Sequence, residues 1–287
     1  MRSHKSDYIL TPRAAPAVRG VSILGDALPQ DMTKLTVVYR LPGMEAAAVR
    51  RAVAYRTNEH GAVTMDLYYP VDPGSQPLPA VVIVLGYPDV GVQTPFGCQF
   101  REMGMMISWA QLFAASGMVG VVYETREPAA DAQAVLAYLQ EHGAELGIDG
   151  TKIGVWSSSG NVPTALSVLM DGKAQCGVLS YGAMLDLDGA TAVSRAAAQY
   201  HFANPCAGRR AEEMPPSTPL FIARAGQDQY GNDSLDAFVA AALRSNLPLT
   251  LMNHATGPHA FDLLEDSDAS REVVQAILAF LRAKLLG

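Results

Sequence analysis

Residues 152–161 read KIGVWSSSGN, an apolar run followed by three serines, a glycine and an asparagine. A short continuous apolar run is typical of a strand that is covered on both faces of a parallel sheet. Pro163 follows two residues later and is suited to the first turn of a helix. The stretch therefore predicts a strand, a tight bend and a helix, with one residue presented at the bend.

Similar apolar runs occur on both sides of this stretch and predict further strands of the same sheet. Helical periodicity separates several of them, over residues 132–139 and 235–242, and a last helical stripe covers residues 274–285. Asn232 or Asp233 could cap the second of these helices. The other apolar runs are VVIVL (81–85), VGVVY (119–123), CGVLS (176–180), PLFIAR (219–224) and LTLM (249–252).

The segment before these runs predicts an antiparallel hairpin at a sheet edge. Residues 49–56 and 62–69 flank a turn at Asn58–Gly61, and the second segment alternates apolar with mostly polar side chains. A hairpin followed by strand–helix repeats predicts an α/β fold, with a mostly parallel central sheet, an antiparallel N-terminal hairpin and helices on both faces. Ligands are then expected at the carboxyl ends of the strands.

Length and composition predict one large domain. The chain has 287 residues, of which 49% are hydrophobic and 17% charged, and a chain of this size can bury about three quarters of its unfolded surface in one body. We expect this domain over residues 46–287, after an extension over residues 1–45 that has little periodicity. Residues 182–216 are longer than a simple crossover needs and could form a small cap over the strand ends.

Several classes of partner are not expected. The net charge of −7 argues against nucleic acid. The three cysteines are too scattered for a disulfide framework, and no H-x-x-x-H or C-x-x-C pair suggests a metal. Because neither a signal-peptide pattern nor an apolar stretch of about 18 residues occurs, we expect a cytoplasmic protein with no membrane partner. A homodimer stays open.

The serine stretch resembles the α/β-hydrolase family, specifically its dienelactone-hydrolase-like branch of small serine esterases. In that family the nucleophile lies in G-x-S-x-G between a strand and a helix, commonly after I-G-x-W. Here I-G-V-W precedes the motif, so the resemblance, which covers about residues 50–286, implies Ser159 as the nucleophile. Ser157 and Asn161 replace the outer glycines. Ser158 is the alternative, but its register would place the bulky Trp156 at the tight first position.

The resemblance also implies an acid and a base, in the chain order nucleophile, acid, histidine. Asp228 follows the run 219–224 in Ala-Gly-Gln-Asp, similar to the family's G-x-D. His259 lies in Gly-Pro-His-Ala-Phe-Asp, similar to G-x-H-x-F, and His254 is the alternative base. A serine hydroxyl needs such a base to take its proton, and the base needs an acceptor to orient it.

Acyl transfer further requires donors for the developing oxyanion. The N–H of Gly160, directly after the nucleophile, is one expected donor, and the N–H of Tyr87, in the loop after the run 81–85, is the other, because Pro88 has no N–H. Gly86 would allow the close approach of that loop. Low-ranked candidates for substrate binding are Gly86, Met105 and Arg126, although Arg126 could instead pair with Glu124 or Glu127.

Together these features imply a serine hydrolase that cleaves small carboxylic esters or lactones through an acyl-enzyme intermediate. Such an enzyme needs no metal or organic cofactor, and its partner is the small-molecule substrate. Two alternatives stay open. The same triad serves thioesterases and peptidases, because one fold hosts many leaving groups, and the altered glycine motif would also fit a non-catalytic binding protein on a hydrolase scaffold.

Overall fold

The structure is a computed structural model that describes residues 31–58, 61–186 and 192–287. Within these residues, eight strands form one sheet in the order β1-β2-β4-β3-β5-β6-β7-β8. The pairs β1–β2 and β2–β4 are antiparallel, and all other neighbours are parallel. The strands are β1 (Ala48–Asn58), β2 (Gly61–Tyr69), β3 (Leu78–Ile83), β4 (Val119–Tyr123), β5 (Ile148–Ser158), β6 (Cys176–Ser180), β7 (Leu220–Ala225) and β8 (Leu249–His254).

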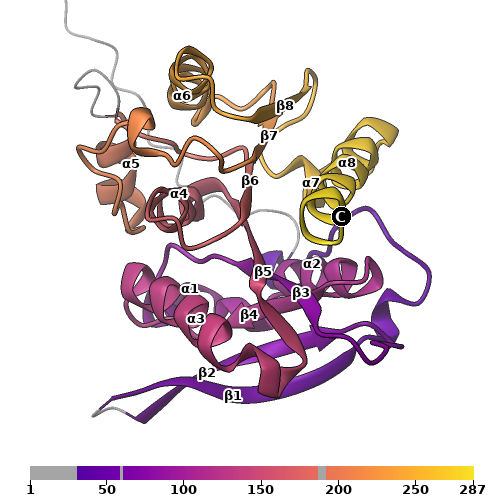
Figure 1. Cartoon of the computed structure of the whole chain (residues 1–287). Coiled ribbons are helices and arrows are strands. Elements are labelled where there is room, and N and C mark those ends of the chain that lie inside the picture. The colour runs from indigo at the N-terminus through magenta and orange to yellow at the C-terminus, as the bar shows by residue number, and fades with distance from the viewer. Residues whose placement is uncertain (1–30, 59–60, 187–191) are drawn as a thin grey trace, which may run out of the picture.

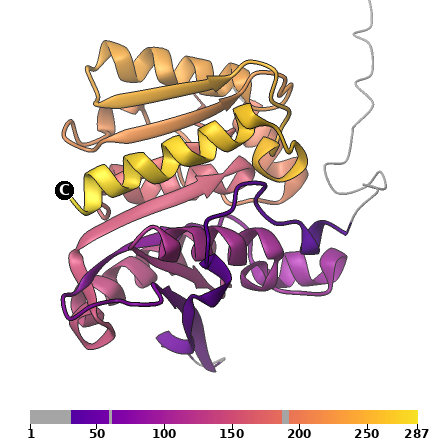
Figure 2. The same cartoon turned by 90° about the vertical axis from the view of Figure 1, so that its right-hand side faces the viewer.

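Helices cover both faces of this sheet, as the sequence predicts. Helices α2 and α8 contact one face, whereas α3, α4 and α6 lie on the other (Figure 1). Figure 2 shows α8 lying along the strands of its face. The helices are α1 (Asp89–Phe96), α2 (Gly104–Ala115), α3 (Pro128–His142), α4 (Val162–Met170), α5 (Ala192–Tyr200), α6 (Asn232–Arg244), α7 (Phe261–Leu264) and α8 (Asp268–Leu285).

The core lies between the central strands and these helices. All five residues of β4 and of β6 are buried, which explains their continuous apolar sequence. Trp156 of β5 packs against Trp109 of α2, with ring centroids 4.7 Å apart. The predicted stripe of α8 is buried against the sheet. No helix in the described ranges is long and apolar enough to cross a membrane.

Two local features differ from what the sequence pattern suggests. Asp66 and Tyr68, which alternate with the apolar residues of β2, are also buried, because helix α2 contacts β2. The Asp66 carboxylate there accepts a hydrogen bond of 2.8 Å from the N–H of Ala52. Helix α6 is capped by Gly231, without a side-chain cap; the amide of Asn232 binds carbonyl oxygens of the preceding loop instead.

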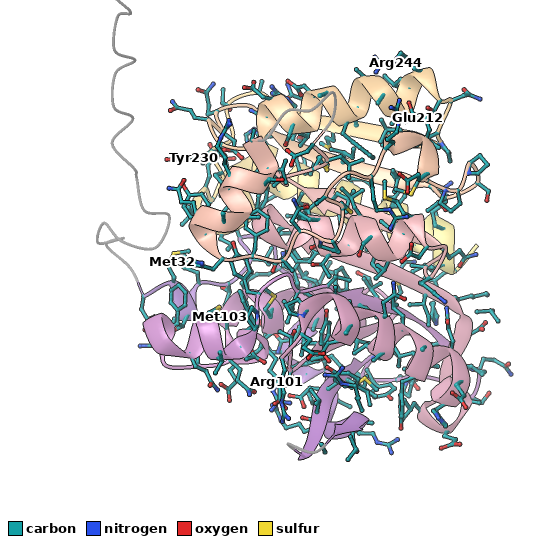
Figure 3. All side chains as sticks on the ribbon, turned by 90° about the vertical axis from the view of Figure 1, so that its left-hand side faces the viewer. Met32, Arg101, Met103, Glu212, Tyr230 and Arg244 are labelled. Atoms are coloured by element: carbon teal, nitrogen blue, oxygen red, sulfur yellow. The ribbon has the colours of Figure 1, made fainter. Side chains whose placement is uncertain are left out.

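The predicted extension is described only from residue 31 onward. This segment crosses α2, where the N–H of Val37 donates to Ser108 Oγ at 3.0 Å. The N–H of Val38 donates to the carbonyl oxygen of Asp262 at 2.8 Å. In Figure 3, Met32 lies at the same margin of the molecule as Tyr230, which is two residues from the candidate acid Asp228. Part of the extension therefore packs on the domain, against the segment of Asp262, three residues after His259.

The candidate cap segment also contacts this edge. Residues 187–191 of the predicted cap lie outside the described residues, and the rest includes α5. The N–H of Ala203 donates to the carbonyl oxygen of Gly86 at 2.7 Å, and Cys206 Sγ lies 3.1 Å from the carbonyl oxygen of Pro163. The segment after α5 therefore lies against the loop that follows β3 and against the start of α4. Its role as a cap stays a prediction.

Candidate active site

The bend after β5 occurs at Ser159. This residue has φ 54°, in the left-handed region that non-glycine residues rarely adopt. Ser158 has φ −139° and is extended, and its side chain is buried beside Tyr181. A strained turn between strand and helix is the position that presents a nucleophile in the G-x-S-x-G motif. The backbone therefore favours Ser159 over Ser158.

Ser159, His259 and Asp228 form one hydrogen-bonded line. Ser159 Oγ lies 2.8 Å from His259 Nε2, and His259 Nδ1 lies 2.7 Å from Asp228 Oδ2. The Asp228 side chain is fully buried, whereas a quarter of the His259 side chain is exposed. The structure thus brings together the three residues that the sequence singles out as nucleophile, base and acid.

The environment of Asp228 favours its charged form. Burial raises the pKa of this carboxyl, but the hydrogen bond and charge of His259 and the backbone N–H groups of Tyr230 and Gly231 outweigh burial and hold the pKa below its ordinary value. The Tyr230 N–H donates to Asp228 Oδ1 at 2.8 Å. One carboxylate oxygen is therefore fixed by backbone, which leaves the other directed at the imidazole.

Direct contacts join the loops that carry the acid and the base. The N–H of Gln227 donates to the carbonyl oxygen of Gly257 at 2.9 Å, and the N–H of Gly226 donates to that of His254 at 2.8 Å. Gly226 has to be a glycine, because a Cβ there would clash with the backbone of Ala255. The two loops follow the paired strands β7 and β8, so sheet pairing brings them to the same edge.

The alternative base, His254, is committed elsewhere. Its ring is buried, with Nε2 lying 2.7 Å from Glu265 Oε2 and 3.0 Å from Ser270 Oγ. These contacts join the end of β8 to α8. The geometry therefore favours His259 as the base.

The expected oxyanion donors lie at the junction of the β3 loop and the bend. Within the described residues, neither the N–H of Tyr87 nor that of Gly160 has a hydrogen-bond partner. Gly86 packs against the bend, because a Cβ there would lie 2.8 Å from Asn161 Cα and from the carbonyl oxygen of Gly160. The Tyr87 ring lies between Phe100 and Phe202. No described protein group therefore occupies either N–H, and their role as oxyanion donors stays a prediction.

Comparison with solved structures identifies the architecture, whereas no family model and no curated protein matches the sequence. A bacterial heroin esterase superposes with a TM-score of 0.64 at 16% identity, covering 86% of this chain and 87% of that chain. A thermostable esterase from Pseudomonas putida ECU1011 gives 0.65 at 14%, covering 86% of each chain. An esterase from the Planctomycetes species Thermogutta terrifontis gives 0.61 at 18%, covering 85% of this chain and 95% of that chain. This chain has the α/β-hydrolase fold.

In this chain the bend follows β5, which lies inside the sheet. The loops that carry Asp228 and His259 meet the bend there. The predictions of fold and sheet are therefore confirmed. The dienelactone-hydrolase-like branch stays a prediction, because the three neighbours named above are described as esterases and not as members of that branch.

The low-ranked substrate residues give a mixed result. Gly86 contacts the bend, as described. Met105 lies in α2, partly buried against the core. Arg126 donates to Glu124 Oε1 through Nη2 at 3.1 Å, which is the ion pair that the sequence left open. Substrate binding by Met105 and Arg126 stays a prediction.

Sequence reasoning missed a buried polar cluster behind His259. The Tyr181 ring packs edge-on against the His259 ring, with centroids 5.0 Å apart, and its hydroxyl donates to Asp262 Oδ1 at 2.6 Å. Trp109 Nε1 donates to Asp262 Oδ2 at 2.9 Å. Burial raises the pKa of Asp262, and these two hydrogen bonds offset only part of that effect. Its position three residues after His259 was the only available signal.

Proposed function

We propose that this protein is a serine hydrolase that cleaves small carboxylic esters and lactones through an acyl-enzyme intermediate. The observation that carries the proposal is the hydrogen-bonded line from Ser159 through His259 to Asp228, which starts at a strained bend after the central strand. The esterase descriptions of the structural neighbours support the same reaction class. The altered glycine motif does not count against it, because the bend keeps its strained geometry.

The first half of the reaction follows from these contacts. With its proton on Nδ1 held by Asp228, His259 accepts the Ser159 proton at Nε2 while Oγ attacks the carbonyl carbon. The carbonyl oxygen becomes an oxyanion, which the N–H groups of Tyr87 and Gly160 bind. Asp228 stabilises the imidazolium. His259 then gives the proton to the departing alkoxide, the C–O bond of the ester breaks, and the acyl group remains on Ser159.

The second half reverses these roles with water. His259 takes a proton from water, the hydroxide oxygen attacks the acyl carbon, and the same two N–H groups bind the second oxyanion. The bond to Ser159 Oγ then breaks as His259 returns the proton to it, which releases the carboxylic acid. For a lactone, the alcohol and acid produced are two ends of one molecule.

Hydrolysis of p-nitrophenyl acetate by the purified full chain tests this function. We expect steady turnover with a burst of p-nitrophenol when deacylation is the slower step. His259→Ala removes the base and should reduce the rate by about 10³-fold or more. If the folded wild-type protein turns over no ester, lactone, thioester or peptide substrate, a binding protein on a hydrolase scaffold becomes the better description.

A further inference from the structure

We propose that Ser157 and Asn161 are positioning residues that hold the loop carrying the Tyr87 N–H against the nucleophile. We call residues 84–87 the oxyanion loop. The inference rests on the proposed function and deepens it. Both residues stand where the family motif has glycine, two positions before and two positions after Ser159. They are the two departures that set this chain apart from G-x-S-x-G.

Each of these side chains makes a hydrogen bond to the oxyanion loop. Ser157 Oγ donates to the carbonyl oxygen of Val84 at 3.0 Å. Asn161 Oδ1 accepts from the N–H of Gly86 at 2.7 Å. Both side chains are buried, so water does not compete for these bonds. Two glycines at these positions could make neither contact.

Other contacts leave Tyr87 as the next free donor of the loop. The N–H of Val84 donates to the carbonyl oxygen of Trp156 at 2.9 Å, and the N–H of Leu85 donates to the Tyr123 hydroxyl at 3.0 Å. Asn161 takes the N–H of Gly86, the last one before Tyr87. We call this hydrogen bond from Gly86 to Asn161 the tether. It lies one peptide away from the expected oxyanion donor, so a shift of the loop there would move that donor directly.

In this chain a glycine of the oxyanion loop, and not a glycine of the serine motif, allows the loop and the bend to pack closely. Gly86 lies so near the bend that a Cβ would stand 2.8 Å from Asn161 Cα. The glycine that allows the close contact therefore lies in the oxyanion loop, at Gly86, so position 161 can carry the side chain of an asparagine. With asparagine in place of the second motif glycine, the close contact between the bend and the oxyanion loop also contains a hydrogen bond. An asparagine in this motif is therefore compatible with an intact bend and adds a link across it.

This link matters because oxyanion donors work by being fixed before the charge develops. Misplacement of a reacting group by about 1 Å can cost as much as 100-fold in rate. Substrate binding in the ground state depends much less on this donor. Loss of the tether is therefore expected to lower kcat while KM changes little.

The test compares Asn161→Ala with Thr164→Val in ester hydrolysis. Thr164 lies one turn further along, is buried, and its hydroxyl has no hydrogen-bond partner among the described residues, so Thr164→Val is a matched control for disturbing the start of α4. We expect Asn161→Ala to lower kcat by roughly 10- to 100-fold and to weaken inhibition by a boronic acid, a mimic of the tetrahedral intermediate, by a similar factor. Thr164→Val should leave both unchanged.

Ser157→Ala supplies the second variant, with an expected loss of a few-fold in both quantities. If folded Asn161→Ala keeps kcat and boronate affinity within about 2-fold of the wild type, the proposal is wrong. If Asn161→Ala does not fold, Ser157→Ala decides alone, and an unchanged kcat overturns the proposal. An inactive wild-type protein would instead refute the proposed function, so the two failures are distinguishable.

Discussion

Oγ of Ser159 and Nε2 of His259 lie 2.8 Å apart, although 100 positions separate them in the sequence. Three packing relationships produce this distance: the parallel pairing of β5 through β8, the left-handed backbone of Ser159, and the hydrogen bonds between the acid and histidine loops. Each of them can be disturbed separately, which makes the proposed chemistry testable residue by residue.

The first prediction distinguishes the two neighbouring serines. Ser159→Ala removes the proposed nucleophile and should reduce turnover of p-nitrophenyl acetate by about 10³-fold or more. Ser158→Ala is the matched control, because it removes a buried hydroxyl from the adjacent position without touching the line to His259. It should keep most of the activity. Loss of activity only in Ser158→Ala would move the nucleophile by one residue.

The second prediction concerns acid stability. Because the folded state lowers the pKa of Asp228, this group contributes stability that is present above its unfolded pKa, about 3.9, and lost as pH falls through the lower folded value. Asp228→Asn should therefore have a lower free energy of unfolding at pH 6, with a shallower decline toward pH 3. Urea titrations across this range measure both. Parallel profiles for variant and wild type would contradict the assigned shift.

The third prediction tests the close approach of the oxyanion loop. Gly86→Ala places a Cβ against backbone atoms that cannot rotate away, so it should destabilise the fold by about 1–3 kcal/mol and lower kcat. Gly91→Ala is the control, because its Cβ would meet only Pro88 Cγ at 3.7 Å, an ordinary contact within α1. That change should be neutral or slightly stabilising. Equal midpoints of urea unfolding in the two variants would refute the packing argument.

The fourth prediction concerns the buried carboxylate of Asp262. Tyr181→Phe keeps the ring against His259 but removes one of the two side-chain donors to this carboxylate. We expect a loss of about 1.5–3 kcal/mol in the free energy of unfolding. Adding Asp262→Asn should recover part of it, because the neutral amide is easier to bury. Additive effects of the two substitutions in a double-mutant cycle would show that the groups do not interact.

The sequence was most informative where local pattern and fold agree. Continuous apolar runs predicted the parallel strands, because burial on both faces leaves no alternation to read. The family resemblance implied the order of serine, aspartate and histidine, and the predicted strand before each residue supported it. Asn161 was harder to interpret, since its partner Gly86 lies 75 positions away and only the folded chain pairs them.

The errors have the same physical origin. Asn232 has the side chain of a good N-cap, but its amide binds the carbonyl oxygens of Ala225 and Asp228 in the acid loop instead. Asp66 alternates with apolar residues along β2, yet it is buried, because helix α2 contacts this strand and the bulged backbone of β1 supplies a donor. Tertiary partners overrode local preference in both places.

Covalent labelling tests the central claim most directly. A fluorophosphonate reacts with a serine only where a base activates the hydroxyl and donors stabilise the phosphoryl oxygen. After incubation of the full chain, mass spectrometry of its peptides locates the adduct. The account predicts a single adduct on Ser159 that disappears in His259→Ala. An adduct on Ser158, or none on a folded wild-type protein, would contradict it.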